Sequence, residues 1–210
     1  MKVVPMIFNT EMVKALLDGR KSVTRRPLII PEGWELKDKK LNRITSSHPK
    51  KWKWGALIRQ ETFDDKYQHD IITAPCFVDD LIYVRETFRL FNHPDECGCS
   101  DYCSCPASGT PIYFADVGRD ENTWKPSIHM PRRASRLTLK VTDVRIEKLN
   151  ELRKCEEQIK KEGFDSWPRF KHIWEGIYGQ SNPNDYVWVI EFEAIRQNVD
   201  KYLSSIKDSA

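Results

Sequence analysis

The sequence predicts an α+β fold built on a small mixed β-barrel, closed or nearly closed, with flanking helices and an inserted cysteine-rich loop. Two observations lead to this class. Short strand patterns and helical patterns follow one another without the regular strand–helix–strand alternation of a doubly wound sheet. The 210 residues are 40% hydrophobic, which suffices for one packed core with decorations. We expect one domain over residues 1–196, with insertions at about 28–75 and 91–110, and a tail over 197–210 that is helical or disordered.

Three helices are predicted where apolar residues recur at helical spacing between a capping residue and a glycine. A capping side chain satisfies the first backbone N–H groups, and glycine adopts the left-handed conformation past the last turn. The pairs of capping residue and glycine are Thr10 with Gly19, Asn150 with Gly163, and Ser166 with Gly179. The first predicted helix ends directly before a basic stretch at residues 20–26.

Strands are predicted at 79–88, 111–116, 135–149 and 185–194, where β-branched and aromatic residues concentrate. In the longest of these, the apolar phase shifts between Val141 and Val144. That shift predicts a β-bulge or a turn between two strands. The irregular segment 28–75 is expected to be an insertion outside the central fold.

The charge balance limits the partners of the protein. The chain has 34 basic and 31 acidic residues and a formal net charge of +3. This balance is too even for a protein that coats nucleic acid by charge alone, so any anion site is local. No run approaches the ~18 consecutive apolar residues of a membrane span, and the first residues lack the apolar core of a secretory signal. We expect a cytoplasmic protein with no membrane partner.

Four of the six cysteines fall close together, at Cys97, Cys99, Cys103 and Cys105. Disulfides are rare in a reducing compartment, whereas four thiolates satisfy tetrahedral Zn²⁺. The surrounding loop has almost no apolar residue to bury, so a metal would supply its local order. We expect a structural Zn²⁺ without an open coordination position. The alternative is a redox-sensitive surface loop that binds no metal.

The stretch GRKSVTRRP contains the residues best suited to chemistry. A turn at Gly19 would let Lys21 and Thr24 point into one cleft, with Arg26 beside them. A threonine hydroxyl is a weak nucleophile that needs a base, and a lysine serves as that base only when it is neutral. Neighbouring arginines and partial burial would lower the pKa of Lys21. The alternative is a solvated basic turn that enters a strand.

Other candidate substrate-binding residues lie in two segments, YVRETF and WKPSIHMPRR. Arg85 and Glu86 would line the mouth of a cleft at a strand end, or form a surface ion pair. His129 could hydrogen-bond a base or act as an acid, although a lone histidine is more often structural. Arg132 belongs to a mixture of basic and aromatic residues typical of single-stranded RNA or nucleotide sites, and a solvated strand edge explains it equally. The run KKWKWG favours nucleic acid only weakly, because its tryptophans could be core residues.

The stretch LLDGRKSVTRRP resembles the signature Gly-x-Lys-x-x-Glu-x-Arg of the ASCH family, whose members are PUA-like β-barrel domains. Gly19, Lys21 and Arg26 match the signature, and Thr24 stands at the usual glutamate position. Most of the chain is similar to phage and prophage ASCH-domain proteins. Those proteins carry segments like FNTEMVKALLDGRKSVTRRP, YVRETF, WKPSIHMPRRASR and YVWVIEFE.

One branch of the family, the small bacterial N4-acetylcytidine amidohydrolases, also has threonine at the position of Thr24, although Ser22 replaces its first threonine. This resemblance implies that Lys21, Thr24 and Glu162 are catalytic. Thr24 would attack the acyl carbon, Lys21 would take its proton, and Glu162 would position the lysine or relay protons. Arg26 or backbone N–H groups would stabilise the oxyanion. Spacing alone does not bring Glu162 to Lys21.

The implied partner is a nucleoside or RNA. Two other functions remain open from the sequence. One is a non-catalytic RNA-binding module in which the same residues hold phosphate. The other is a phage accessory protein that binds a host protein partner through the insertion and the cysteine loop.

Overall fold

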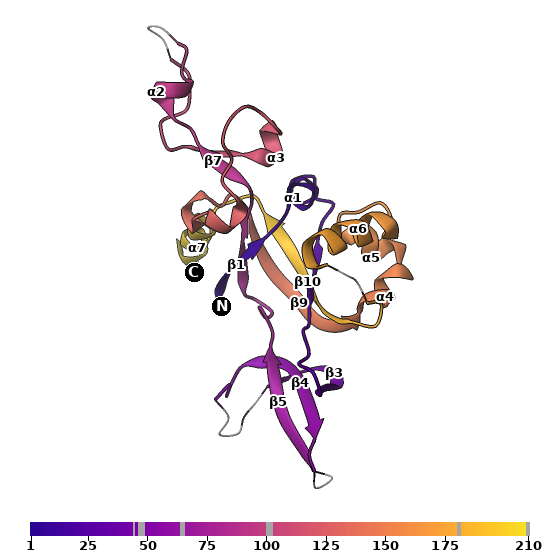
Figure 1. Ribbon diagram of the computed structural model, residues 1–210. Coiled ribbons are helices and arrows are strands. Elements are labelled where there is room, and N and C mark those ends of the chain that lie inside the picture. The colour runs from indigo at the N-terminus through magenta and orange to yellow at the C-terminus, as the bar shows by residue number, and fades with distance from the viewer. Residues whose placement is uncertain (44, 46–48, 64–65, 100–102, 180–181, 209–210) are drawn as a thin grey trace.

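The computed structural model describes residues 1–43, 45, 49–63, 66–99, 103–179 and 182–208. Its central element is a five-stranded sheet with the order β1-β6-β9-β10-β2 (Figure 1). These strands are β1 (Val3–Ile7), β2 (Val23–Pro27), β6 (Leu81–Arg85), β9 (Thr138–Lys148) and β10 (Tyr186–Ile195). β1 and β6 run parallel, and the other neighbouring pairs are antiparallel. The mixed α+β class is confirmed.

The sheet is open between its two edge strands, β1 and β2. Within the described chain no backbone ladder joins these strands. Instead, the Arg26 side chain on β2 donates from Nη2 to the carbonyl of Ile7 at the end of β1, at 2.7 Å. A closed barrel is therefore not formed. Helix α1 (Thr10–Leu17) and the turn after it carry the chain from β1 to β2.

Helix α1 follows the predicted pattern with one correction at its start. Asn9, and not Thr10, is the N-cap, because the Asn9 side chain accepts a hydrogen bond from the Met12 N–H at 2.8 Å. Gly19 has φ +72°, the left-handed conformation expected past the helix end. The apolar side of α1, which includes Leu16, is buried in the main core.

The bulge predicted in the longest strand is confirmed. β9 pairs with β10 along its length, but the register shifts where Glu191 faces Asp143 and Phe192 faces Val141. Thr142 is the additional residue on β9. A bulge bends the strand locally, which preserves burial of apolar residues on both sides of it.

Helices α4 (Leu149–Arg153), α5 (Glu156–Lys161) and α6 (Trp167–Tyr178) pack on one side of the sheet (Figure 1). The prediction of a single helix from Asn150 to Gly163 is wrong, because two helices, α4 and α5, form in its place. The N-cap of α4 is Lys148, two residues before the predicted Asn150, and the Glu151 carboxylate accepts from the Lys148 N–H at 3.2 Å. The end of α4 comes at the extended residue Cys155, after which α5 begins anew with two glutamates in its first turn, where negative charge is favourable.

The helix predicted from Ser166 to Gly179 is confirmed as α6, and the C-terminal tail forms α7 (Val199–Asp208). The predicted strand at 79–88 is interrupted at Glu86, because the chain leaves the main sheet there to form β7 (Phe88–Leu90). The predicted strand at 111–116 is only half correct. β8 (Pro111–Tyr113) is followed by helix α3 (Phe114–Val117), whose Phe114 ring packs edge-on against Trp124 with a centroid distance of 5.1 Å.

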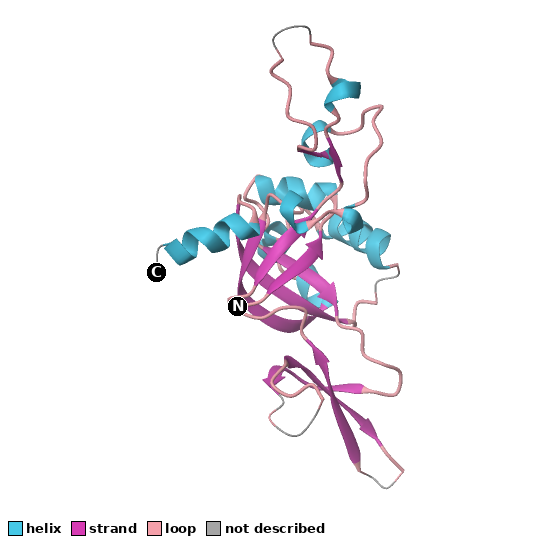
Figure 2. Ribbon diagram, turned by 90° about the vertical axis from the view of Figure 1, so that its left-hand side faces the viewer, coloured by secondary structure: helices cyan, strands magenta, loops and turns pink. Residues whose placement is uncertain are grey.

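Two segments project from opposite ends of the main sheet (Figures 1 and 2). One is a separate three-stranded sheet of β3 (Glu35–Arg43), β4 (Trp54–Glu61) and β5 (Tyr67–Thr73). The other contains β7, β8, α2 (His93–Glu96) and the cysteine-rich loop. Two short 3₁₀ helices, η1 (Ser127–His129) and η2 (Arg132–Ala134), return the chain to β9. Parts of both predicted insertions, at 44, 46–48, 64–65 and 100–102, lie outside the described residues.

The main core lies between the sheet and its helices. Strands β9 and β10 supply its centre, where Leu139, Val141, Trp188 and Ile190 are buried. Among the described residues, no helix has the length and apolar character needed to cross a membrane.

Candidate functional site

A buried ion pair joins Lys21 and Glu162. Gly19 ends α1 in the left-handed conformation, and the chain then pairs Lys21 with Glu162 in an isolated antiparallel bridge. The Lys21 Nζ donates to Glu162 Oε2 at 2.6 Å and to the Glu162 carbonyl at 2.8 Å. Both side chains are almost completely buried, with 0% and 1% exposure. The structure therefore brings together two of the three residues that the family resemblance implies are catalytic.

Arg25 completes this cluster from β2. Its Nη1 donates to Glu162 Oε1 at 3.0 Å, so one buried carboxylate lies between two cations. Its Nη2 donates to Glu147 Oε2 at 2.9 Å and to Gln158 Oε1 at 3.3 Å. These hydrogen bonds offset part of the cost of removing the charges from water. The sequence analysis considered Arg25 only as one of the neighbouring arginines that would lower the pKa of Lys21, and it did not predict the contact with Glu162.

Burial lowers the pKa of the Lys21 ammonium below its usual value. The positive charges of Arg26 and Arg25 lower it further, whereas Glu162 opposes the shift. A lowered pKa increases the fraction of neutral amine, which is the form that accepts a proton. The cluster is thus suited to proton transfer as well as to holding α5 against β2.

Thr24 is separated from this cluster by strand alternation. Thr24 and Arg25 are consecutive in β2, and consecutive side chains of a strand point to opposite faces. Thr24 is buried, with 1% exposure. The structure therefore unites Lys21 with Glu162 and leaves Thr24 on the face that carries Arg26.

A cavity of about 440 Å³ lies beside Arg26, at the open edge between β1 and β2. Its lining residues come from the end of β1, the link to α1, the start of α1, β2, the link between β6 and β7, η1 and α6. They are Ile7, Phe8, Asn9, Thr10, Met12, Arg26, Thr87, Ser127, Ile177 and Tyr178. The Arg26 guanidinium lies 5.1 Å from the centroid of the Phe8 ring and donates from Nη1 to the Tyr178 hydroxyl at 2.8 Å. Arg26 Nε is buried and has no hydrogen-bond partner among the described residues.

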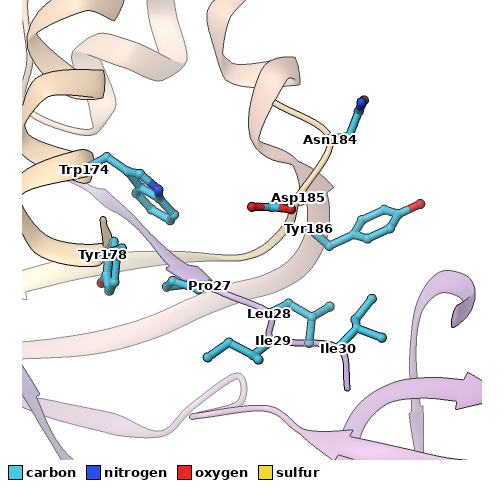
Figure 3. Close-up of a pocket in the computed structure, with 9 residues that line it drawn as sticks. All are labelled: Pro27, Leu28, Ile29, Ile30, Trp174, Tyr178, Asn184, Asp185 and Tyr186. Atoms are coloured by element: carbon cyan, nitrogen blue, oxygen red, sulfur yellow. The ribbon is translucent and has the colours of Figure 1, made fainter. Parts of the chain in front are cut away.

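Tyr178 also lines a second cavity, of about 410 Å³, between α6 and the turn before β10. Figure 3 shows Trp174 and Tyr178 on one side of this cavity and Asp185 on the other. The Asp185 carboxylate points toward the two rings, whereas the Tyr186 ring points away from them. Because Arg26 bonds the Tyr178 hydroxyl, this pair lies at the boundary between the two cavities.

The structure places the other predicted binding residues apart from the Arg26 cavity. Glu86 is not paired with Arg85, because Arg136 binds both carboxylate oxygens of Glu86 at 3.0 Å. Burial raises the pKa of Glu86, against the opposing effect of Arg136. His129 is exposed on η1. Arg132 pairs with Asp200 of α7 at 2.5 Å.

Of the ten residues that line the Arg26 cavity, the sequence analysis predicted only Arg26 as a binding residue, and the polar residues that it missed include Thr87, Ser127 and Tyr178. Thr87 follows Glu86 directly, and Ser127 is two residues from His129. The sequence analysis therefore selected the correct segments, but it named their ionisable residues as binding residues and not these two hydroxyl residues. Tyr178 is the last residue of α6 and was not among the apolar residues predicted for the buried side of that helix.

The four loop cysteines come together after α2. The Sγ atoms of Cys97, Cys99, Cys103 and Cys105 all lie within 4.8 Å of one another. The His93 Nε2 lies 3.2 Å from Cys103 Sγ. Hydrogen bonds from the Cys97 thiol, the Cys105 backbone and His93 lower the pKa of Cys103 to about 6. Because cysteine sulfurs are good metal ligands, four of them this close together fit a metal ion.

Comparisons of the chain with models of known protein families, with curated proteins and with solved structures find no match.

Proposed function

We propose that the protein binds a nucleoside, a modified cytidine above all, in the cavity beside Arg26, and that the chain is an ASCH-type domain related to PUA-like folds. One observation carries this proposal. Segments that carry the resemblance to phage ASCH proteins lie far apart in the sequence, yet three of them line one cavity. The first segment contributes Phe8, Thr10 and Arg26, YVRETF contributes Thr87, and WKPSIHMPRRASR contributes Ser127.

The groups around the cavity are those that a nucleoside requires. Its volume of about 440 Å³ lies within the range of ~300–1,000 Å³ typical of small-molecule sites. Apolar side chains such as Phe8 and Ile177 can contact the faces of a base. Hydroxyl groups of Thr87 and Ser127 and the unpartnered Arg26 Nε can bond its edges or the ribose.

Titration calorimetry with cytidine and N4-acetylcytidine tests this proposal. Arg26→Met removes the donor beside the cavity and is expected to weaken binding ~10-fold or more, because a hydrogen bond to a charged group contributes about 1.5–3 kcal/mol. Ser127→Ala removes a single hydroxyl and is expected to weaken binding more modestly. The matched control is Ser204→Ala, an exposed hydroxyl on α7. Absence of nucleoside binding by the wild type, or binding unchanged in both cavity variants, would refute the proposal.

Hydrolysis of an acylated cytidine is the second candidate function, favoured by the contact between Lys21 and Glu162. In this reaction the Thr24 hydroxyl attacks the acyl carbon and forms an acyl ester, and the cytidine amine leaves with a proton. Water then releases the acyl group from Thr24. Since Thr24 is on the opposite face of β2 from Arg25, the reaction requires that the Lys21 amine reach the Thr24 hydroxyl when substrate is bound.

Chromatography of N4-acetylcytidine incubated with the protein tests this second candidate. Thr24→Val preserves the shape of the side chain and removes its hydroxyl, so turnover should disappear while nucleoside binding persists. Lys21→Met should also abolish turnover. Wild-type protein that binds the nucleoside without converting it would refute hydrolysis and leave a non-catalytic nucleoside- or RNA-binding function.

We further propose that Cys97, Cys99, Cys103 and Cys105 hold a structural Zn²⁺. The mutual approach of their Sγ atoms supports this assignment, because four thiolates are a complete tetrahedral ligand set. Elemental analysis of protein purified without added metal should find about one zinc per chain. The double variant Cys99→Ser/Cys105→Ser should lose it. A wild-type content below about half a zinc per chain would refute the proposal.

A further inference from the structure

An exposed tryptophan lies between β3 and β4 of the separate three-stranded sheet. Trp52 is 55% exposed and has φ +68°. The left-handed conformation is unfavourable for a residue with a large side chain, and such strain is characteristic of functional positions. Folding stability alone therefore does not explain a tryptophan here, because glycine would adopt the same backbone without strain.

Cations surround the Trp52 ring. The Arg43 guanidinium lies 4.9 Å from its centroid, and the Lys51 Nζ lies 5.1 Å from it. Lys53 lines a hollow of about 240 Å³ together with Trp52 and Lys2. None of these four cationic side chains forms an ion pair with another residue in the described part of the chain. Their positive charge is therefore available to an anionic partner.

The neighbouring Trp54 is a rigid part of this surface. Its ring stacks on Phe77 with a centroid distance of 4.6 Å and an interplanar angle of 3°. Arg43 also lies 5.9 Å from the Trp54 centroid, so it spans both tryptophans. Trp54 is half-buried and held by Phe77, whereas Trp52 is directed to solvent. The surface thus combines one exposed ring with several cations around a rigid support.

We propose that this surface binds single-stranded nucleic acid, with a base stacked on Trp52 and the adjacent phosphates bound by Arg43, Lys51 and Lys53. Aromatic rings and cations together recognise single strands, because each base presents a stacking face and each phosphate a charge. The long side chains of Arg43 and Lys51 can turn from the ring to a phosphate and leave a face of Trp52 to a base. A duplex hides its base faces and offers only charge.

The surface around Trp52 lies on a separate sheet and shares no residue with the nucleoside cavity proposed above. It also gives the protein a local polyanion site despite its modest net charge. If both sites function, the nucleoside bound beside Arg26 would belong to a nucleic-acid strand that also contacts Trp52. If only the surface around Trp52 functions, the protein binds RNA or DNA without a nucleoside site.

Fluorescence anisotropy with labelled oligouridine and oligothymidine of about twelve nucleotides tests the proposal. Wild-type protein should bind at least one of them, and the affinity should fall steeply between about 50 and 200 mM salt. Tighter binding of oligouridine would indicate contacts to the 2′-hydroxyl, and equal binding would indicate recognition of base and phosphate alone. Both results support the proposal.

The decisive variant is Trp52→Gly, which removes the ring and suits the left-handed backbone, so it should not unfold the protein. We expect its affinity for the oligonucleotide to fall about tenfold, because stacking on one aromatic ring is worth about 1–3 kcal/mol per base. Lys51→Ala/Lys53→Ala should also weaken binding and reduce the salt dependence. The matched control is Lys201→Ala/Lys207→Ala, two exposed lysines on α7.

Three results would overturn the proposal: no binding of either oligonucleotide by the wild type, equal affinity for a duplex of the same length, or an affinity unchanged by Trp52→Gly. Titration with free N4-acetylcytidine is measured separately and reports on the cavity beside Arg26. A failure of nucleoside binding with oligonucleotide binding intact would refute the cavity function alone.

Discussion

The Nζ atom of Lys21 lies 2.6 Å from Oε2 of Glu162, although 141 residues separate the two in the sequence. Glu162 also accepts a hydrogen bond from Arg25. Removal of the Glu162 carboxylate would therefore leave two buried cations without their shared partner. We predict that Glu162→Gln lowers the free energy of unfolding by about 3–5 kcal/mol. Lys21→Met should cost less, about 1–2 kcal/mol, because Arg25 still satisfies Glu162. Urea denaturation measures both, and a larger loss for Lys21→Met would contradict this order.

The lowered pKa of Lys21 predicts a pH dependence of stability. Burial reduces proton affinity in the folded state, so between the folded-state pKa and the ordinary value of 10.5 the unfolded chain binds more protons. Stability therefore rises with pH in that window. The free energy of unfolding of the wild type, relative to Lys21→Met, should increase as the pH approaches 10.5. Urea titrations at several pH values measure this difference, and a decrease would contradict the lowered pKa.

Gly163 keeps Glu162 in place through a close approach to α1. It has φ +87°, and an added Cβ would lie 2.6 Å from the Ala15 Cβ. Gly163→Ala should therefore cost about 1–3 kcal/mol for the clash, in addition to the left-handed strain. The matched control is Gly19→Ala, which has φ +72° and open space around the added methyl. Comparable melting temperatures for the two variants would refute the packing explanation.

Removal of the proposed metal should have a local effect. The cysteine loop follows α2 in a segment that projects from the main sheet (Figure 1), and its described residues are not part of the main core. Chelation is expected to expose the loop to limited proteolysis while the core unfolds at the same temperature. Mass spectrometry of the fragments and thermal denaturation measure the two effects. A large fall in the melting temperature of the core would contradict a local structural role.

Local features of the fold could be predicted from the sequence, because they depend on neighbouring residues. The left-handed glycine after α1, the extent of α6 and the bulge in β9 all follow from spacing within a few residues. The predicted cap at Thr10 was wrong because Asn9 offers a side-chain acceptor one residue earlier. The break at Cys155 was missed because the apolar spacing continues across it.

Long-range features could not be predicted in the same way. A closed barrel requires that β1 and β2 pair, and their local patterns do not show that α1 and Arg26 connect them instead. Arg85 and Glu86 are adjacent in sequence, yet Glu86 finds its cation in Arg136, fifty residues away. The contact between Lys21 and Glu162 was suggested only by family resemblance, because no spacing rule joins positions so far apart.

The most direct test of nucleoside recognition is a nuclear magnetic resonance titration of isotope-labelled protein with N4-acetylcytidine. Saturable shifts are predicted for the backbone amides of Thr10, Thr87 and Ser127, which come from three distant segments but line one cavity. Amides on α7, such as that of Ser204, should not move. No saturable shifts, or shifts confined to residues outside the cavity, would contradict the assignment of the Arg26 cavity as the nucleoside site.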